Sequence, residues 1–334
     1  MELEFAQSIL SNFGLKESIV SIKRIESGLI NSTFLLNSKT NSYILQAINT
    51  NIFPNYEKGL ENILNVGNWL KKKNYPYFFP LPIKGEYLKV KNEVWRLMPF
   101  VKNSISYNRV SSLDQVKNAA NCLGEFYHYL SGFSTESLAI TFPDFHNGNS
   151  IIKKFEDALT NGDRKRLLLA KPLINEIFSE LPILKKWDEL CNSLPTRVVH
   201  YDTKINNFLF DKKTDEVLAI IDFDTLMPGC VLSDIGDMIR TYCNPVGEES
   251  KEIEKVICNR EIVNVIIKEF AKTASLEKKE KENLFWGGLA ITLMQCVRFL
   301  NDYLNGNSYY KISYASQNLI RAKNQLALYK SLKN

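Results

Sequence analysis

The sequence contains few of the residues that build metal and redox centres. Only three histidines and six cysteines occur among 334 residues, and no two cysteines form a Cys-x-x-Cys pair. The cysteines stand in apolar contexts with no cluster of histidines beside them. Because structural zinc needs such clusters, we expect no zinc site and predict buried free thiols in a reducing compartment.

The sequence also lacks a basic segment interleaved with aromatics and an apolar run of about 18 residues. The net charge is +5, and the lysines are spread along the chain. The first residues, Met1 to Glu4, do not show the basic-then-apolar pattern of a signal peptide. These absences predict a cytoplasmic protein with no nucleic-acid partner and no membrane association, and they leave the oligomeric state open.

The composition that remains is that of an ordinary globular protein, with 45% hydrophobic and 24% charged residues. No internal repeat and no low-complexity linker divides the chain. This length fits one large two-lobed domain or two domains, with enough apolar material for a sizeable core.

The first hundred residues favour β-structure. Alternating apolar and polar residues, separated by turn residues, predict strands at 19–26, 32–38, 42–48, 85–90 and 93–98. Helical spacing of apolar residues predicts helices at 3–12 and 55–73. Pro99 then interrupts the strand pattern.

The rest of the chain is mostly helical. Apolar periodicity predicts helices at 113–131, 148–160, 165–178, 180–193, 251–274, 278–304 and 313–332. The segment 197–224 differs, since it favours short strands and a loop. We therefore predict an α+β fold with a small, mostly β N-terminal lobe (1–98), a larger, mostly α C-terminal lobe (99–334) and a hinge at about 97–102.

The strongest chemical signal runs from His200 to Asn207 and reads His-Tyr-Asp-Thr-Lys-Ile-Asn-Asn. It satisfies His-x-Asp-x-x-x-x-Asn, the spacing of a kinase catalytic loop. Asp202 can take the proton of an acceptor hydroxyl, and Asn207 can ligate magnesium without adding charge. Lys204 can place a cation near the transferred phosphoryl group. The alternative interpretation is an Asn- and Asp-rich turn between strands.

A second acidic motif follows fifteen residues after Asn207, where the apolar run ending at Ile221 delivers Asp222. Kinases place their second metal-binding carboxylate in this way, in an Asp-Phe-Gly motif. The third residue here is Asp224 instead of glycine, and it can serve a second metal or the acceptor. Its alternative is a surface carboxylate. Asp234, near the start of the next helical stretch, is predicted to have a structural role.

The segment Glu26 to Phe34 places one glycine, Gly28, between two strand-like runs. Its backbone amides and the side chains of Ser27, Asn31 and Thr33 can hold nucleotide phosphates. An ordinary hairpin turn is the alternative for this segment.

Taken together, these residues resemble the aminoglycoside phosphotransferase and choline kinase superfamily, whose fold is protein-kinase-like, and within it the N-acetylhexosamine 1-kinases. The matching stretches cover most of the chain and are 27–33, 43–50, 143–147, 200–207, 221–229, 234–240 and 298–306. The catalytic stretches are typical of the superfamily, whereas 43–50, 225–229 and 298–310 are specific to the hexosamine kinases.

The resemblance implies an enzyme that uses ATP and Mg²⁺ to phosphorylate the anomeric hydroxyl of N-acetylglucosamine or N-acetylgalactosamine. It implies that Asp202 is the base and that Asn207 and Asp222 hold magnesium.

The resemblance also implies the binding surfaces. The backbone between Met98 and Phe100 would meet adenine, and Arg298 and Tyr309 would contact the sugar. His146 is a further candidate in its loop. The alternatives are a structural ion pair for Arg298, a loop-structure role for His146 and aromatic core packing for Tyr309.

One departure from the superfamily concerns the strand at 43–48, where many members carry a phosphate-binding lysine. Gln46 stands there and supplies no cation. Two alternatives to a sugar 1-kinase stay open, and the missing lysine motivates the second of them. The first is a kinase of the same fold that acts on choline, homoserine, methylthioribose or an aminoglycoside, and the second is a nucleotide-binding protein without catalysis.

Overall fold

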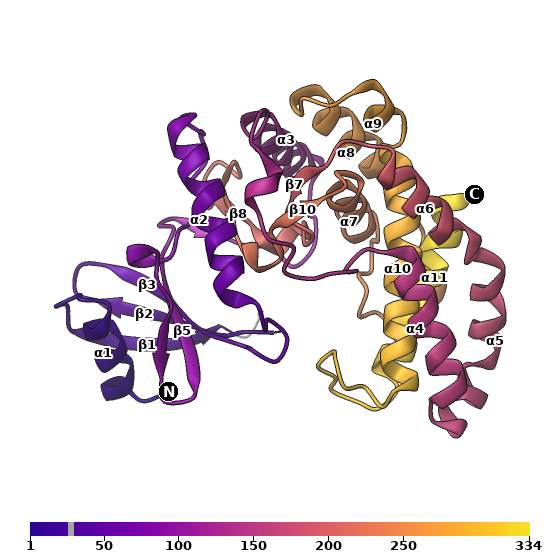
Figure 1. Ribbon diagram of the computed structural model, residues 1–334, viewed down its shortest axis with the longest axis horizontal. Helices are drawn as coiled ribbons and strands as arrows, with labels where there is room; N and C mark the ends of the chain where they lie inside the picture. The colour runs from indigo at the N-terminus through magenta and orange to yellow at the C-terminus, as the bar shows by residue number, and fades with distance from the viewer. Residues whose placement is uncertain (26–29) are drawn as a thin grey trace. The chain divides into compact units, whose positions relative to one another are not determined.

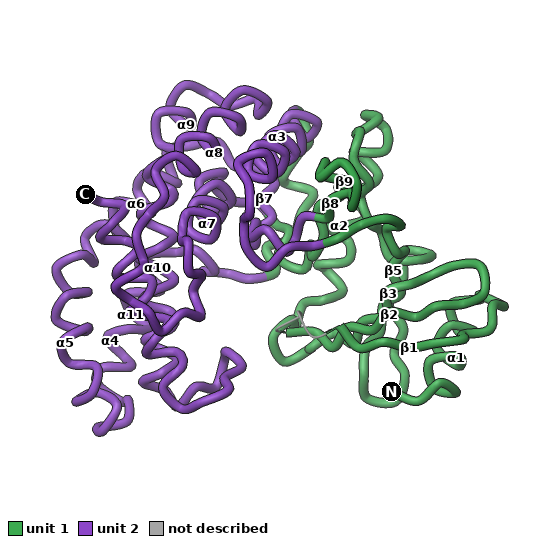
Figure 2. The backbone as a smooth tube through the Cα atoms, turned by 180° about the vertical axis from the view of Figure 1, so that it is seen from behind, with its two compact units in different colours: residues 1–105, 132–141, 209–227 green, residues 106–131, 142–208, 228–334 purple. Residues whose placement is uncertain are grey.

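The computed structural model describes residues 1–25 and 30–334. It confirms the predicted α+β class, with a β-rich N-terminal part and a helical C-terminal part. The chain forms two compact units (Figure 2): the first comprises 1–105, 132–141 and 209–227, and the second 106–131, 142–208 and 228–334. The lobe bounds 1–98 and 99–334 stay a prediction.

The first unit contains an antiparallel five-stranded sheet with the order β1-β2-β3-β5-β4 (Figure 1). Its strands are β1 (Ile19–Ile25), β2 (Ser32–Ser38), β3 (Ser42–Ile48), β4 (Leu88–Val90) and β5 (Glu93–Pro99). The strands β2 and β3 match their predicted ranges. The strand β4 begins later than predicted, because a 3-10 turn at Ile83–Gly85 comes first and Gly85 has a φ of 66°.

The two faces of this sheet carry different residues. On one face, helix α1 (Leu3–Asn12) contributes Ile9 and Leu10 to a core that includes Leu45 and Leu97. Because side chains alternate along a strand, Thr33 of β2, Gln46 of β3 and Arg96 of β5 belong to the other face. The register pairs Thr33 with Gln46 and Gln46 with Arg96, so these side chains form one cross-strand polar row.

The first unit also contains helix α2 (Tyr56–Lys72) and strand β6 (Ser104–Ile105), which lies beside β8 (Phe208–Asp211) in a small sheet completed by β9 (Val217–Ile220). The hairpin of β8 and β9 confirms the predicted strands in this region. After β9, a 3-10 helix at Phe223–Thr225 buries Phe223 against Phe79, with ring centroids 4.3 Å apart.

The second unit is built mainly from helices. They are α3 (Leu113–Tyr129), α4 (Gly148–Asn161), α5 (Arg164–Glu180), α6 (Pro182–Asn192), α7 (Leu232–Tyr242), α8 (Arg260–Thr273), α9 (Lys278–Glu282), α10 (Leu284–Leu304) and α11 (Gln317–Lys333). The remaining short strands are β7 (Arg197–Val199) and β10 (Met227–Gly229). The helix predicted at 251–274 begins only at Arg260, where the Asn259 side chain caps it, and the one predicted at 278–304 breaks at Asn283.

Helix α10 is the central helix of the second unit, and α7 packs against it backbone to backbone. A Cβ atom on Gly236 would lie 2.5 Å from the carbonyl oxygen of Gly287, so this approach requires glycine. Among the described residues, α10 is the one helix long and apolar enough to cross a membrane, but 67% of its apolar window is buried. A core helix meets the same criterion.

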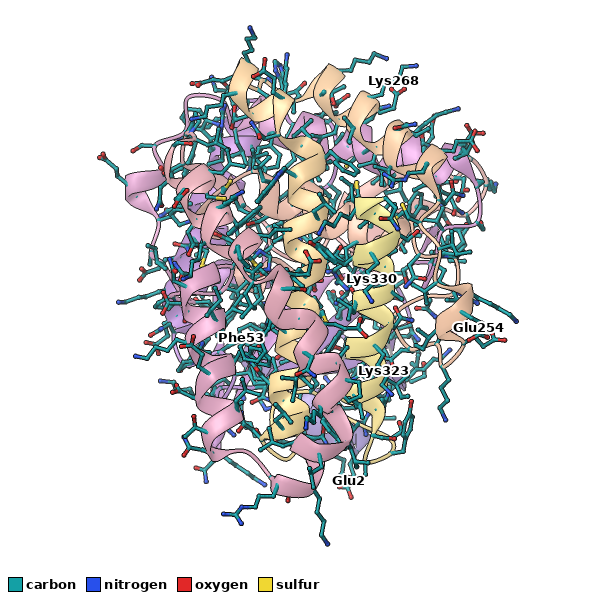
Figure 3. All side chains as sticks on the ribbon, turned by 90° about the vertical axis from the view of Figure 1, so that its right-hand side faces the viewer. Glu2, Phe53, Glu254, Lys268, Lys323 and Lys330 are labelled. Atoms are coloured by element: carbon teal, nitrogen blue, oxygen red, sulfur yellow. The ribbon has the colours of Figure 1, made fainter. Side chains whose placement is uncertain are left out.

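Helix α11 shows how burial separates its two sides. Lys323 and Lys330 point outward (Figure 3), whereas Leu326 and Tyr329 are buried. Lys330 pairs with Glu176 of α5. Polar residues such as Asn318, Arg321 and Asn324 are buried on this helix as well, so its buried side is of mixed polarity.

Candidate functional site

The loop that follows β7 is held by one buried carboxylate, Asp234 of α7. Its Oδ2 accepts hydrogen bonds from the backbone N–H of His200 at 2.9 Å and from the Tyr127 hydroxyl at 2.8 Å. Its Oδ1 accepts one from the backbone N–H of Tyr201 at 2.6 Å. Thr203 donates to the Asp234 carbonyl oxygen at 2.6 Å. The structural role predicted for Asp234 is thus to anchor this loop.

The anchoring holds the loop in a conformation that a non-glycine residue rarely adopts. Tyr201 has a φ of 69°, and such backbone strain persists only where the surroundings impose it. The Tyr201 hydroxyl donates to the carbonyl oxygen of Pro228 at 3.2 Å. A Cβ atom on Gly229 would lie 1.8 Å from that hydroxyl, so a larger residue there would have to displace the Tyr201 side chain.

Asp202, Lys204 and Asn207 come together in this loop. Lys204 Nζ donates to Asp202 Oδ2 at 2.8 Å, and both side chains are partly exposed. Asn207 is buried, and its Nδ2 donates to the carbonyl oxygen of Asp202 at 2.8 Å. Burial opposes ionisation of Asp202, but the charge and the hydrogen bond of Lys204 hold its pKa below the ordinary value. The arrangement favours an ionised carboxylate.

The donor types of Asn207 and Asp222 fit a magnesium ion. The Asn207 amide nitrogen is used within the loop, so the side-chain carbonyl oxygen is the atom that can ligate a metal. Asp222, which belongs to the first unit, offers a carboxylate at a left-handed turn with φ 68° and ψ 57°. In residues 1–25 and 30–334, no group of three or more His, Cys, Asp or Glu side chains can hold a metal. Mg²⁺ commonly takes one or two protein oxygens and completes its coordination with phosphates and water.

Two of the predicted sugar contacts, Arg298 and His146, lie beside the same aromatic ring in the second unit. The Arg298 guanidinium lies over the Phe145 ring, 4.6 Å from its centroid, and Phe145 stacks on His146 at 4.9 Å. The His146 and Tyr201 rings are 5.2 Å apart. Within the part of the chain that the structure describes, no ion pair involves Arg298, whose Nη1 instead donates to Gln295 at 3.3 Å. The structural ion pair considered for Arg298 is therefore not seen there.

His146 is neutral in this setting. Burial, followed by the positive charge of Arg298, holds the pKa of His146 well below its ordinary value. Its Nδ1 is buried and has no hydrogen-bond partner among the described residues. The backbone carbonyl of His146 accepts from Trp187 Nε1 at 2.8 Å, which fixes the loop.

Tyr309 lies in the loop after α10, and Asp302 shapes this loop. The carboxylate of Asp302 accepts the backbone N–H of Tyr309 at 2.8 Å and that of Tyr310 at 3.0 Å. It also accepts from Asn318 Nδ2 at 2.8 Å. The Tyr309 side chain stays largely exposed, which does not favour the core role considered for it. Tyr310 packs on Phe299 with centroids 4.8 Å apart.

The first unit holds a separate buried network centred on Arg96. Its guanidinium forms a two-nitrogen ion pair with the Asp224 carboxylate, with Nη2 to Oδ2 at 3.0 Å. Its Nε donates to Gln46 Oε1 at 2.8 Å, and its Nη1 also donates to the Tyr87 hydroxyl at 3.1 Å. Burial opposes the charge, but Asp224 keeps the pKa of Arg96 above its ordinary value.

The same network includes two predicted nucleotide-binding residues. Asn31 Nδ2 donates to Asp224 Oδ2 at 2.7 Å, and Gln46 Nε2 donates to Thr33 Oγ1 at 3.0 Å. Arg96 itself did not emerge from the sequence as a site residue. The available signal was a charged residue inside the strand Val94-Trp95-Arg96-Leu97, opposite the Gln46 that stands in place of lysine.

The other predicted residues are placed as follows. Ser27 and Gly28 lie outside the described residues. Met98 pairs with Ile44 near the end of β5, and Phe100 follows that strand half-buried. Their nucleotide-binding role stays a prediction.

Several solved structures that this chain resembles are phosphotransferases or kinases of small molecules. The spectinomycin phosphotransferase APH(9)-Ia, in complex with ADP and spectinomycin, has a TM-score of 0.64 at 12% identity over 100% of this chain and 99% of that chain. The microcompartment-associated aminopropanol kinase has a TM-score of 0.64 at 14% identity, covering 98% and 97%. The GDP complex of aminoglycoside 2'-phosphotransferase-IIIa gives 0.62 at 17%, covering 97% and 98%.

At these identities the likeness concerns the fold, which is that of the kinase-like phosphotransferases. Residues 21–253 match the model of the phosphotransferase enzyme family, which includes the aminoglycoside phosphotransferases. This chain belongs to that family.

Proposed function

We propose that this protein transfers the γ-phosphoryl group of ATP to the anomeric hydroxyl of an N-acetylhexosamine, N-acetylglucosamine or N-acetylgalactosamine, giving the sugar 1-phosphate and ADP. The observation that carries the proposal is the loop His200–Asn207, where Asp202, Lys204 and Asn207 hydrogen-bond with one another. ADP and AMP complexes of spectinomycin phosphotransferase support nucleotide use. The expected location is the cytoplasm.

The proposed chemistry begins at Asp202. Its carboxylate takes the proton of the anomeric hydroxyl as that oxygen attacks the γ-phosphorus. The new oxygen–phosphorus bond forms while the bond between the γ-phosphorus and the β–γ bridging oxygen breaks, and ADP leaves. Lys204, which already contacts Asp202, places a positive charge near the transferred group.

Asn207 and Asp222 are the residues proposed to hold Mg²⁺. When bound, the ion neutralises charge on the β- and γ-phosphates. In the first unit, Asn31 and Thr33 with Ser27 are proposed to face the nucleotide phosphates, and the backbone at Met98 and Phe100 the adenine.

The acceptor proposal rests on Arg298 and its neighbours. A guanidinium without a carboxylate partner can donate to hydroxyls and to an acetamide carbonyl. The neutral His146 beside it can do the same, and the exposed Tyr309 ring can stack on a sugar face. Asp224 is the other proposed acceptor contact, although Arg96 and Asn31 already occupy its oxygens.

The positive charge of Arg298, which is unpaired among the described residues, also bears on the main alternative, a kinase of the same fold that acts on another acceptor. Choline and aminoglycosides are cationic, and they need an acidic acceptor pocket. The positive charge of Arg298 disfavours such acceptors. A neutral or zwitterionic acceptor such as methylthioribose or homoserine is less affected, so these belong in the test.

We predict that release of ADP requires an N-acetylated hexosamine. With N-acetylglucosamine or N-acetylgalactosamine, kcat/KM should exceed that with glucose by about 10-fold or more, because the site then pairs its donors with the acetamide. The measurement is coupled ADP release over a panel that includes choline, homoserine, methylthioribose and an aminoglycoside. Phosphorus NMR of the product identifies the phosphorylated position. Turnover restricted to an amine, or equal silence with all sugars, would reject the sugar proposal.

We predict that Asp302→Ala weakens acceptor binding without affecting the nucleotide. Removing the carboxylate leaves the backbone N–H groups of Tyr309 and Tyr310 without acceptors, so the loop loses its shape. The KM for the sugar should rise by about 10-fold, as for loss of roughly one positioned contact, while the KM for ATP changes little.

The matched control for this prediction is Asn259→Ala, which removes a side chain that also accepts two backbone N–H groups, at the start of α8. It should lower the thermal stability without changing the KM for the sugar. An equal rise in both Michaelis constants for Asp302→Ala would contradict the role of this loop.

A further inference from the structure

Gln46 of β3 has Arg96 of β5 as its cross-strand neighbour, and Arg96 is a buried cation on this face of the sheet. We propose that Arg96 is a positioning residue: through its ion pair with Asp224 it fixes the turn that carries Asp222, the carboxylate proposed to bind the magnesium nucleotide. This inference rests on the proposed function and deepens it.

The geometry shows that Arg96 acts through Asp224 and not by direct contact with a phosphate. All three guanidinium nitrogens already donate to protein oxygens, those of Gln46, Tyr87 and Asp224. The side chains of Arg96 and Asp224 are only 3% and 8% exposed. The pair has no net charge, and it holds Asp224 in place. The negative charge of Asp222 also helps to keep the pKa of Arg96 above its ordinary value, so Arg96 stabilises this turn at Asp222 as well.

The contacts of Asp224 restrain the turn that carries Asp222. Asp222 directly follows the residue after β9 and has a left-handed backbone, which a non-glycine residue keeps only when both sides are held. On one side the strand β9 holds it. On the other side Phe223 packs on Phe79, and Asp224 is held by Arg96 and Asn31.

Gln46 orients the guanidinium group of Arg96. Its amide oxygen accepts from Arg96 Nε and its amide nitrogen donates to Thr33, so it orients the guanidinium within the polar row. A lysine at this position would place two cations side by side. A neutral amide at position 46 is therefore the residue that fits beside the buried Arg96.

The test measures metal–nucleotide binding as well as turnover. Binding of Mn²⁺ in the presence of ADP is followed by electron paramagnetic resonance for the wild type and for Arg96→Met, Arg96→Lys and Asp224→Asn. Loss of a residue that orients a metal ligand typically costs 10- to 100-fold in metal affinity or activity. We therefore expect Arg96→Met to weaken Mn²⁺ binding by about 10-fold or more and to lower kcat by about 100-fold.

Arg96→Lys should restore part of the loss, because lysine keeps the charge but cannot bond to Gln46 and both Asp224 oxygens. The double variant Arg96→Met/Asp224→Asn should lose less than the sum of the single losses, since the two residues act as one pair. If Arg96→Met does not fold, the inference is tested by Asp224→Asn, which preserves the shape of the side chain.

The matched control is Arg321→Met. Arg321 is likewise buried and its guanidinium pairs with Glu249, but it lies in the second unit on α11. Its loss should reduce thermal stability and leave Mn²⁺ binding with ADP unchanged.

Two results would overturn the inference in different ways. If Arg96→Met and Asp224→Asn bind Mn²⁺ within about twofold of wild type and lose only stability, as the control does, the role of Arg96 is rejected. The proposed function is not affected by that result. No Mn²⁺ binding with ADP by the wild type would reject the proposed function, and the inference with it.

Discussion

Asp202→Asn is expected to lower kcat by about 1,000-fold while ADP and ATP still bind. The carboxylate oxygen that accepts the proton becomes an amide that cannot, and positioned general bases contribute roughly 100- to 10,000-fold. The Asn207 contact goes to the backbone carbonyl of Asp202, so the substitution leaves that part of the loop intact. Steady-state kinetics with the best acceptor measures kcat, and fluorescence titration measures the affinity for ADP and ATP.

The control for this variant is Asp157→Asn, which makes the same chemical change on the exposed side of α4. It should leave kcat within experimental error of wild type. A kcat for Asp202→Asn within about threefold of wild type would contradict the role of Asp202 as base. A wild-type protein that binds ATP but transfers no phosphoryl group to any acceptor would instead favour the nucleotide-binding alternative without catalysis.

Asp234→Ala is expected to produce the largest loss of stability of the proposed variants. It leaves three buried donors without acceptors, the backbone N–H groups of His200 and Tyr201 and the Tyr127 hydroxyl. Each unsatisfied buried group costs about 1–3 kcal/mol, so the three donors together cost at least about 3 kcal/mol. We expect the free energy of unfolding to fall by about 3–5 kcal/mol, measured by urea denaturation.

Tyr127→Phe is the graded companion of this variant. It removes one donor to Asp234 and keeps the ring that packs on Phe270. The free energy of unfolding should fall by about 1 kcal/mol, the net value of one hydrogen bond, and kcat should change little. Equal losses for the two variants would show that the loop does not depend on the backbone contacts of Asp234.

Local sequence patterns were sufficient where the physics is local. The strands β2 and β3 were predicted at their observed bounds because alternation and the turn at Asn37–Asn41 specify them. The loop residues Asp202, Lys204 and Asn207 were found together because their spacing along the chain already fixes their neighbourhood. Asp234 was assigned a structural role from its place near the start of a helical stretch, and its partners His200 and Tyr201 lie 34 and 33 positions away.

Other features depend on partners far along the chain. Arg96 and Asp224 are separated by 128 positions, and no periodicity links a charged strand residue to a carboxylate after β9. The strand β6 is two residues long and exists because it pairs with β8. The break at Asn283 was missed because the apolar period of α10 continues the helical pattern of α9 without a strong stop signal.

The close contact of Gly236 with Gly287 has a consequence for how this protein can change. The anchor Asp234 lies two residues before Gly236 on α7, while Arg298 and Asp302 lie on α10 beyond Gly287. Helix α10 therefore supports both the loop His200–Asn207, through α7, and the segment 305–316 that carries Tyr309. If the proposed acceptor contacts are right, substitutions in that segment should change acceptor preference while the loop held by Asp234 keeps its place.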